Sequence, residues 1–417
     1  MKTLPLILAA AAVALAVPAR AEQEKPAEPP PGKKNPPVSA TGDGFSIQSD
    51  DGDYKLQLRG YAQLDGRFFP GDDDNVSVDQ FLLRRARPIV QGTVARYFDF
   101  NITPDFGGGT TVLQDAYLDV HTTSKLRVRF GKFKSPVGLE RLQSASVNTF
   151  VERAYPTALV PNRDVGIMVH GELAKGVVSY AAALVNGAPD GGSVDLDTND
   201  GKDVAGRVFF SPWKPGKSFL KDLGFGIAGT TGHQSGPLPA YRSGGQVSIV
   251  TIVQGITGDG TRNRYSPQLS FYSGPFGLLA EYAHSDSRVK KADGTHADLE
   301  GRAWQTTASF VLTGDNASFG GVRAGKPFDP AKGQWGAFEV AGRVNGIEFG
   351  REAVDDGIVD GAKSVRKAFA WAVGLNWWLN RNIRALFDYE RTTFTGGAAG
   401  RDREPENALF IRTQVSF

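Results

Sequence analysis

The chain of 417 residues contains no cysteine and only five histidines. The lack of cysteine excludes a disulfide framework and any metal site built on thiolates. The histidines are scattered and form no HExxH motif. Two glycine-rich stretches, 224–229 and 320–326, match nucleotide-binding patterns only in part, because no βαβ unit follows the first and Pro327 follows the second where a Ser or Thr is required. We therefore expect no metal and no cofactor.

Long apolar runs are missing after the N-terminus. No later stretch approaches 18 apolar residues without a charge, so we expect no membrane-spanning helix in the mature protein. The first 21 residues differ: Lys2 precedes an apolar run from Leu4 to Val17, and Ala19-Arg20-Ala21 forms a small-x-small cleavage site before Glu22. This pattern predicts a cleaved secretory signal peptide at 1–21.

The mature chain also lacks a charge excess. Residues 1–21 carry Lys2 and Arg20 and no acid, which leaves 45 Lys and Arg against 45 Asp and Glu. Any ion preference must come from where the charges lie, and no nucleic-acid partner is expected. Residues 22–43 are rich in proline and charge and cannot bury a core, which predicts a disordered or polyproline-like periplasmic leader.

From Gly44 onward, the chain alternates between apolar and polar residues. Within 54–68, one face carries Leu56, Leu58, Ala62, Leu64 and Phe68. The other face carries Lys55, Gln57, Arg59, Gln63, Asp65 and Arg67. This period of two predicts a strand. Its length exceeds the five or six residues usual for a soluble strand and suits a tilted membrane strand with an overhang.

The alternation recurs in segments such as 98–103, 115–121, 338–344 and 409–417. About sixteen such strands fit between residue 54 and the C-terminus, an even number within the range of bacterial barrels. We therefore predict an all-β fold, a transmembrane antiparallel β-barrel over 44–417, in the bacterial outer membrane. Four aromatic residues near the expected strand ends suit the girdles of such barrels: Tyr97, Trp377, Trp378 and Tyr389.

The connections also alternate in length. Short ones at 122–125, 174–176 and 274–275 predict periplasmic turns. Long ones predict external loops: 135–164, 187–202, 233–261, 287–299, 345–367 and 395–406. The connection 314–333 is long, although the alternation of short turns and long loops requires a short turn at this place.

Four motifs resemble those of the phosphate-selective porins of the O and P type: Phe81–Arg87 (FLLRRAR), Gln114–Leu118 (QDAYL), Arg129–Glu140 (RFGKFKSPVGLE) and Phe328–Glu339 (FDPAKGQWGAFE). The resemblance covers about residue 54 to the end. It implies a sixteen-stranded, usually trimeric barrel whose third external loop folds into the pore. In the best-known members an arginine ladder and a lysine cluster pass phosphate or polyphosphate, while relatives carry other anions or lack strong selectivity.

Basic residues cluster where this resemblance is found. Guanidinium groups can replace the hydration shell of an oxyanion with charge-assisted hydrogen bonds, and a row of moderate sites lets the ion leave again. Arg141 and Arg153 add bases on the long loop. The candidate pore-lining residues are Arg59, Arg84, Arg85, Arg87, Asp115, Arg127, Arg129, Lys132, Lys134 and Arg163.

Strict alternation puts Arg84 on the opposite face from Arg85 and Arg87, where lipid contact near mid-bilayer costs about 2–4 kcal/mol. Arg84 must then lie near an interface, or a bulge must turn it inward, as the resemblance favours. The alternation at Lys132 and Lys134 is similarly disturbed after Gly131. Alternatively, these bases are solvated or pair with Asp99, Asp115 and Asp119.

The sequence therefore predicts a porin that conducts small anions by passive diffusion, with outer-membrane lipid and two further copies of itself as partners. A general or sugar-diffusion porin is the alternative, and the basic clusters argue against it. A barrel enzyme would need a nucleophile with a histidine at the rim. No nucleophile motif accompanies His233, His284 or His296, so we expect no enzyme.

Overall fold

The computed structural model describes residues 38–72, 77–197 and 199–417. The expected signal peptide and residues 22–37 of the expected leader lie outside these described residues. A hairpin of β1 (Val38–Thr41) and β2 (Gly44–Gln48) opens the described chain. Regular β structure therefore begins inside the range 22–43 that we assigned to the leader.

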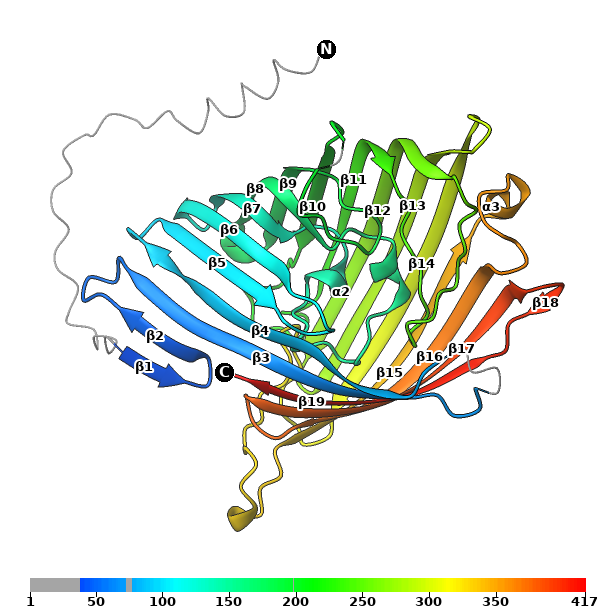
Figure 1. Ribbon diagram of the computed structural model, residues 1–417. Helices are drawn as coiled ribbons and strands as arrows, with labels where there is room; N and C mark the ends of the chain where they lie inside the picture. The colour runs from blue at the N-terminus through cyan, green and yellow to red at the C-terminus, as the bar shows by residue number, and fades with distance from the viewer. Residues whose placement is uncertain (1–37, 73–76, 198) are drawn as a thin grey trace, which may run out of the picture. The chain divides into compact units, whose positions relative to one another are not determined.

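Sixteen long strands of the described chain form a closed antiparallel barrel (Figure 1). They are β3 (Lys55–Phe68), β4 (Gln80–Val94), β5 (Phe98–Asp105), β6 (Val112–Thr123), β7 (Leu126–Lys134), β8 (Arg163–Leu173), β9 (Val178–Val185), β10 (Asp203–Phe210), β11 (Gly224–Gly236), β12 (Thr257–Ser273), β13 (Phe276–Lys290), β14 (His296–Val311), β15 (Ala337–Phe349), β16 (Val365–Trp378), β17 (Ile383–Ala398) and β19 (Glu406–Ser416). The two-residue strand β18 (Arg401–Asp402) lies between β17 and β19.

Each barrel strand pairs with its neighbour in the sequence, and β19 returns to pair with β3. The register places Leu409–Ser416 opposite Tyr61–Phe68. The β1–β2 hairpin adds to the first residues of β3, beyond the end of β19. Because β19 pairs with β3, the sheet of barrel strands closes on itself, as a membrane-spanning sheet requires.

The helical segments are short: α2 (Leu139–Leu142), η1 (Tyr155–Ala158), η2 (Ala174–Gly176), η3 (Pro330–Lys332) and α3 (Glu352–Asp355). Across the described ranges, none of the helices combines the length and the apolar character needed to cross a membrane.

The two faces of the strands differ as the alternation predicts. Along β19, Leu409, Ile411 and Val415 are exposed, whereas Arg412 and Gln414 are buried. The faces predicted for 54–68 are confirmed in the same way by β3. Because successive side chains point to opposite sides of a strand, the barrel presents apolar residues outward and polar residues inward.

One aromatic residue departs from the expected girdle. Trp378 is buried and faces inward, where the guanidinium carbon of Arg384 lies 3.8 Å from its ring centroid. Trp377 packs against Phe328 and Phe338. Adjacent strand residues point to opposite faces, so this Trp pair cannot place both rings against lipid.

The three short turns are confirmed, at 124–125, 174–176 and 274–275. The expected loop 287–299 is shorter, because β13 and β14 stay paired up to Lys290 and His296 and leave only 291–295. The expected loop 233–261 shrinks to 237–256 for the same reason. Polar residues of strand ends look like loop residues in the sequence. The connection between β14 and β15, yellow in Figure 1, is long, as predicted, and spans 312–336.

Candidate functional site

The segment 135–162 joins β7 to β8 and is held by side chains of distant strands. Its backbone N–H groups donate hydrogen bonds to three of them: Leu139 to Glu281 on β13, Tyr155 to Asn345 on β15 and Val151 to Asp388 on β17. Its carbonyl groups accept others, from Gln63 on β3 at Ala145 and from Arg384 on β17 at Asn148. These contacts hold the segment against the polar faces of strands far from β7 in the sheet order.

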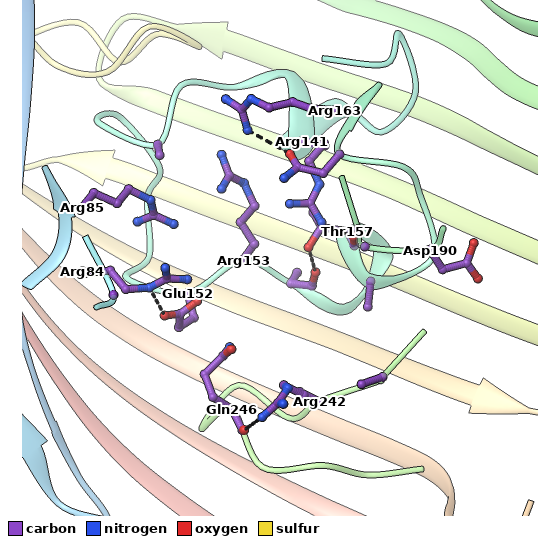
Figure 2. Close-up of a pocket in the computed structure, with 18 of the residues that line it drawn as sticks. Arg84, Arg85, Arg141, Glu152, Arg153, Thr157, Arg163, Asp190, Arg242 and Gln246 are labelled. Atoms are coloured by element: carbon purple, nitrogen blue, oxygen red, sulfur yellow. Dashed lines mark hydrogen bonds and ion pairs between the residues drawn. The ribbon is translucent and has the colours of Figure 1, made fainter. Parts of the chain in front are cut away.

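A cavity of about 640 Å³ lies between this segment, β4 and residues 239–246 of the β11–β12 loop. We call it the arginine cavity. Its charged lining residues are Arg84, Arg85, Arg87, Asp105, Lys134, Arg141, Glu152, Arg153, Arg163, Asp190, Arg242 and Glu390. Eight cations thus face four carboxylates, a formal excess of four positive charges. Figure 2 shows the arginines gathered around the open space.

A bulge in β4 brings both Arg84 and Arg85 to this cavity. Gln63 pairs with Arg85 and the next residue of β3 pairs with Leu83, so Arg84 is the additional residue. The Arg84 Nε lies 3.4 Å from a carboxylate oxygen of Glu152, and Arg85 donates to the Gln63 side chain at 2.8 Å. Of the two expected arrangements of Arg84, the structure therefore has the bulge, which the resemblance favoured, and Arg84 avoids the lipid face.

Three cations of the cavity have carboxylate partners. Arg84 shares Glu152 with Arg67, Arg87 lies 2.7 Å from Asp105, and Arg163 lies 3.2 Å from Asp115.

The other five form no ion pair within the described chain: Arg85, Lys134, Arg141, Arg153 and Arg242. They donate to neutral groups instead. Lys134 bonds to the carbonyls of Leu142 and Gln143, and Arg141 to that of Thr157. A bound anion would supply the missing countercharge.

The pKa values of three residues in the segment 135–162 are shifted by burial and by the neighbouring charges. Burial, with the charges of Arg153 and Arg163, lowers the pKa of Arg141 to about 9. Burial and Arg163 lower the pKa of Arg153 to about 10, against the opposing charge of Glu140. Burial alone would raise the pKa of Glu152, but Arg84 and Arg67 outweigh it and bring that pKa to about 2. All three groups stay charged at neutral pH, and the arginines gain from an added anion.

Other candidates lie elsewhere. Asp115, Arg127 and Arg129 line a second cavity of about 710 Å³, which Lys134 also borders. Arg127 and Arg129 both pair with Asp119, at 3.2 Å and 2.6 Å. For these two arginines, the structure has the acid pairing that we gave as the alternative.

Lys132 differs from the expectation. It lines none of these cavities, and its ammonium pairs with Asp195. The pairing of β7 with β8 is unbroken from Arg127 to Lys134, so no inserted residue turns Lys132 toward the face of Arg129. Lys134 still reaches the arginine cavity, because it lies at the strand end and bonds to the segment 135–162.

Arg242 was missed by the sequence analysis. It lies in the loop 237–256, which no periodic signal marks. Contacts with remote parts hold that loop: Ser243 donates to Glu406 at 2.9 Å, and the Val365 N–H donates to the Ile249 carbonyl at 2.7 Å. No group of three or more potential metal ligands occurs within the described ranges.

Comparison with known proteins agrees with the resemblance found in the sequence motifs. The family model of phosphate-selective porin O and P matches residues 56–417. No curated protein matches the chain.

Several solved structures share the fold. OmpT of Vibrio cholerae is 12% identical, with a TM-score of 0.53 over 88% of this chain and 98% of that one. The outer membrane channel DcaP of Acinetobacter baumannii is 10% identical, with a TM-score of 0.56 over 89% and 99%. An anion-selective porin from Comamonas acidovorans is 12% identical, with a TM-score of 0.55 over 87% and 100%.

At these identities the solved structures show the fold alone, whereas the family model covers most of the sequence. The chain belongs to the phosphate-selective porin O and P family and is a β-barrel channel of the bacterial outer membrane.

Proposed function

We propose that the protein passes small oxyanions, phosphate or polyphosphate foremost, by passive diffusion through a pore lined by arginine and lysine. The observation that carries this proposal is the set of five cations in the arginine cavity that lack an ion pair in the described chain. A multivalent oxyanion accepts several charge-assisted hydrogen bonds at once, which chloride cannot do to the same extent.

We further propose that the segment 135–162 is the third external loop, folded into the barrel to narrow the pore. It is the third connection at its end of the barrel, after 69–79 and 106–111. Its hydrogen bonds to β3, β13, β15 and β17 support this role. It would bring Arg141 and Arg153 close to Arg85, where restricted water strengthens electrostatic attraction.

The carboxylates of the cavity weaken anion binding, which suits a transport site better than a tight binding site. Glu152 and Asp105 neutralise Arg84 and Arg87, so they limit the affinity for an anion. A channel needs binding that favours entry and still permits release.

Single-channel recording in planar bilayers tests the proposal. We expect the parent channel to prefer chloride over potassium, and we expect added phosphate to block the chloride current in a concentration-dependent manner. A channel that passes potassium as readily as chloride would contradict the proposal and favour general diffusion.

We also propose export with cleavage after residue 21 and assembly as a homotrimer. A trimer form of OmpT of Vibrio cholerae shares the fold at 11% identity, with a TM-score of 0.53 over 87% of this chain and 99% of that one. Native mass spectrometry in mild detergent should therefore find three copies of a chain that starts at Glu22. A monomer across several detergents, confirmed by the absence of cross-linked species, would contradict this assembly.

A further inference from the structure

The long connection 312–336 returns toward the barrel instead of forming a short turn. The Ala317 N–H donates to the Gly274 carbonyl at 2.8 Å, and Gln143 donates to the Phe319 carbonyl at 2.9 Å. Val322 is buried in a cluster with Trp378. The connection is thereby fixed against both the inward face of β16 and the segment 135–162.

This arrangement brings Arg323 to a third cavity, of about 170 Å³. We call it the exit cavity, because it lies beside the short turn between β16 and β17 and the C-terminal Phe417. Its charged lining residues are Asp43, Arg59, Arg323, Arg381 and Arg384. Four arginines from three parts of the chain thus surround one carboxylate.

Most of this positive charge has no countercharge. Arg381 pairs with Asp43, but Arg59, Arg323 and Arg384 form no ion pair within the described ranges. The Nε atoms of Arg59 and Arg384 are buried without a hydrogen-bond partner.

Asp43 lies in the turn between β1 and β2, and two hydrogen bonds hold that turn in place. Asn382 donates to the Gly42 carbonyl, and Gln57 donates to the Asp43 carbonyl, both at 2.9 Å. A hydrogen bond from Arg381 lowers the pKa of Asp43, and the charges of Arg323 and Arg59 add to this effect. The surrounding arginines therefore stabilise a negative charge in this cavity, and the Asp43 carboxylate supplies it.

We propose that the exit cavity is a second oxyanion site, at which a small inorganic oxyanion competes with the Asp43 carboxylate for Arg323, Arg381 and Arg59. Its volume admits such an ion, since a water molecule takes up about 30 Å³ of the liquid. The inference rests on the proposed anion transport and adds a site that shares none of its lining arginines with the arginine cavity. Neither the arginine cavity nor the segment 135–162 supplies these three arginines.

The absence of native cysteine makes a direct test possible. Arg323 is exposed, so Arg323→Cys gives a single accessible thiol. Its rates of reaction with an anionic and a cationic methanethiosulfonate reagent are compared in the purified channel. We expect the ratio of anionic to cationic rate to exceed that of Lys332→Cys by about tenfold, because clustered charge concentrates counter-ions by that order or more.

Lys332 is the control position, since it lies in the same connection and is exposed. Asp329→Asn is added to this control variant, because Asp329 pairs with Lys332 and would otherwise repel the anionic reagent. Inorganic phosphate should slow the reaction at position 323 and leave position 332 unchanged. Asp43→Asn in the Arg323→Cys background should raise the anionic rate further, because the resident carboxylate is removed.

Equal rate ratios at the two positions, or no protection by phosphate, would overturn the exit site. If the parent channel prefers anions in that case, the proposed function stands without the exit site. Suppose instead that the ratio of anionic to cationic rate is high at position 323, but the channel does not prefer anions. That result would refute the proposed function, while the exit cavity would still be an anion site. Resistance of each variant to unfolding in SDS at room temperature confirms an intact barrel.

Discussion

Replacing Arg85 with alanine should raise the phosphate concentration for half-block of chloride current by about tenfold, with no loss of barrel stability. Arg85 is buried in the arginine cavity and is hydrogen-bonded to Gln63, with no ion pair in the described chain. Its loss removes at least one charge-assisted hydrogen bond to the anion, worth roughly 1.5–3 kcal/mol, and about 1.4 kcal/mol is a factor of ten. Single-channel titration with phosphate measures this shift.

Arg85→Ala should weaken phosphate binding without lowering the stability of the barrel. A buried cation without a countercharge destabilises the fold, and the charges of Arg84 and Arg412 repel Arg85. We therefore expect the Arg85→Ala barrel to unfold at the same temperature as the parent or above it, as followed by its heat-dependent mobility in SDS gels.

Lys132→Ala is the control for the change in charge. It removes one buried cation, but that cation pairs with Asp195 outside the arginine cavity. Its phosphate block should equal that of the parent. An equal loss of block in Lys132→Ala and Arg85→Ala would show that total charge matters and that the cavity does not.

Replacing Asp65 with alanine should cost about 3–5 kcal/mol of stability, the usual effect of removing one partner of a buried ion pair. Both oxygens of Asp65 accept hydrogen bonds from Arg412 at 2.6 Å. The side chain of Asp65 is 0% exposed and that of Arg412 is 1% exposed. Urea unfolding in detergent, followed by tryptophan fluorescence, measures the change.

The two partners should not be equivalent. Without Asp65, Arg412 stays buried and still repels Arg85, so this repulsion adds to the loss of the pair. Without Arg412, the nearby charge of Arg84 still attracts the Asp65 carboxylate. We expect Asp65→Ala to be less stable than Arg412→Ala, and the double variant to be more stable than Asp65→Ala alone. An Asp65→Ala barrel as stable as the parent would contradict this account.

The barrel and the two faces of its strands could be predicted from the sequence alone. Side chains alternate across a strand with a period of two, so Leu409 and Arg412 had to lie on opposite sides once 409–417 was taken as a strand. The same rule required Arg84 to lie near an interface or on a bulge, because a guanidinium group against lipid is costly, and the family resemblance favoured the bulge. The alternation behind both predictions depends only on residues next to one another in the chain.

Which cations keep a free charge was decided by the tertiary structure. Arg127 and Arg85 look alike in the sequence, yet Arg127 pairs with Asp99 and Asp119 while Arg85 forms no ion pair in the described chain. Arg242 and Arg323 come from connections without periodicity, whose paths are set by contacts with remote strands. A charge is neutralised by the group that folding brings next to it, and that group is often far away in sequence, as Glu152 is from Arg67.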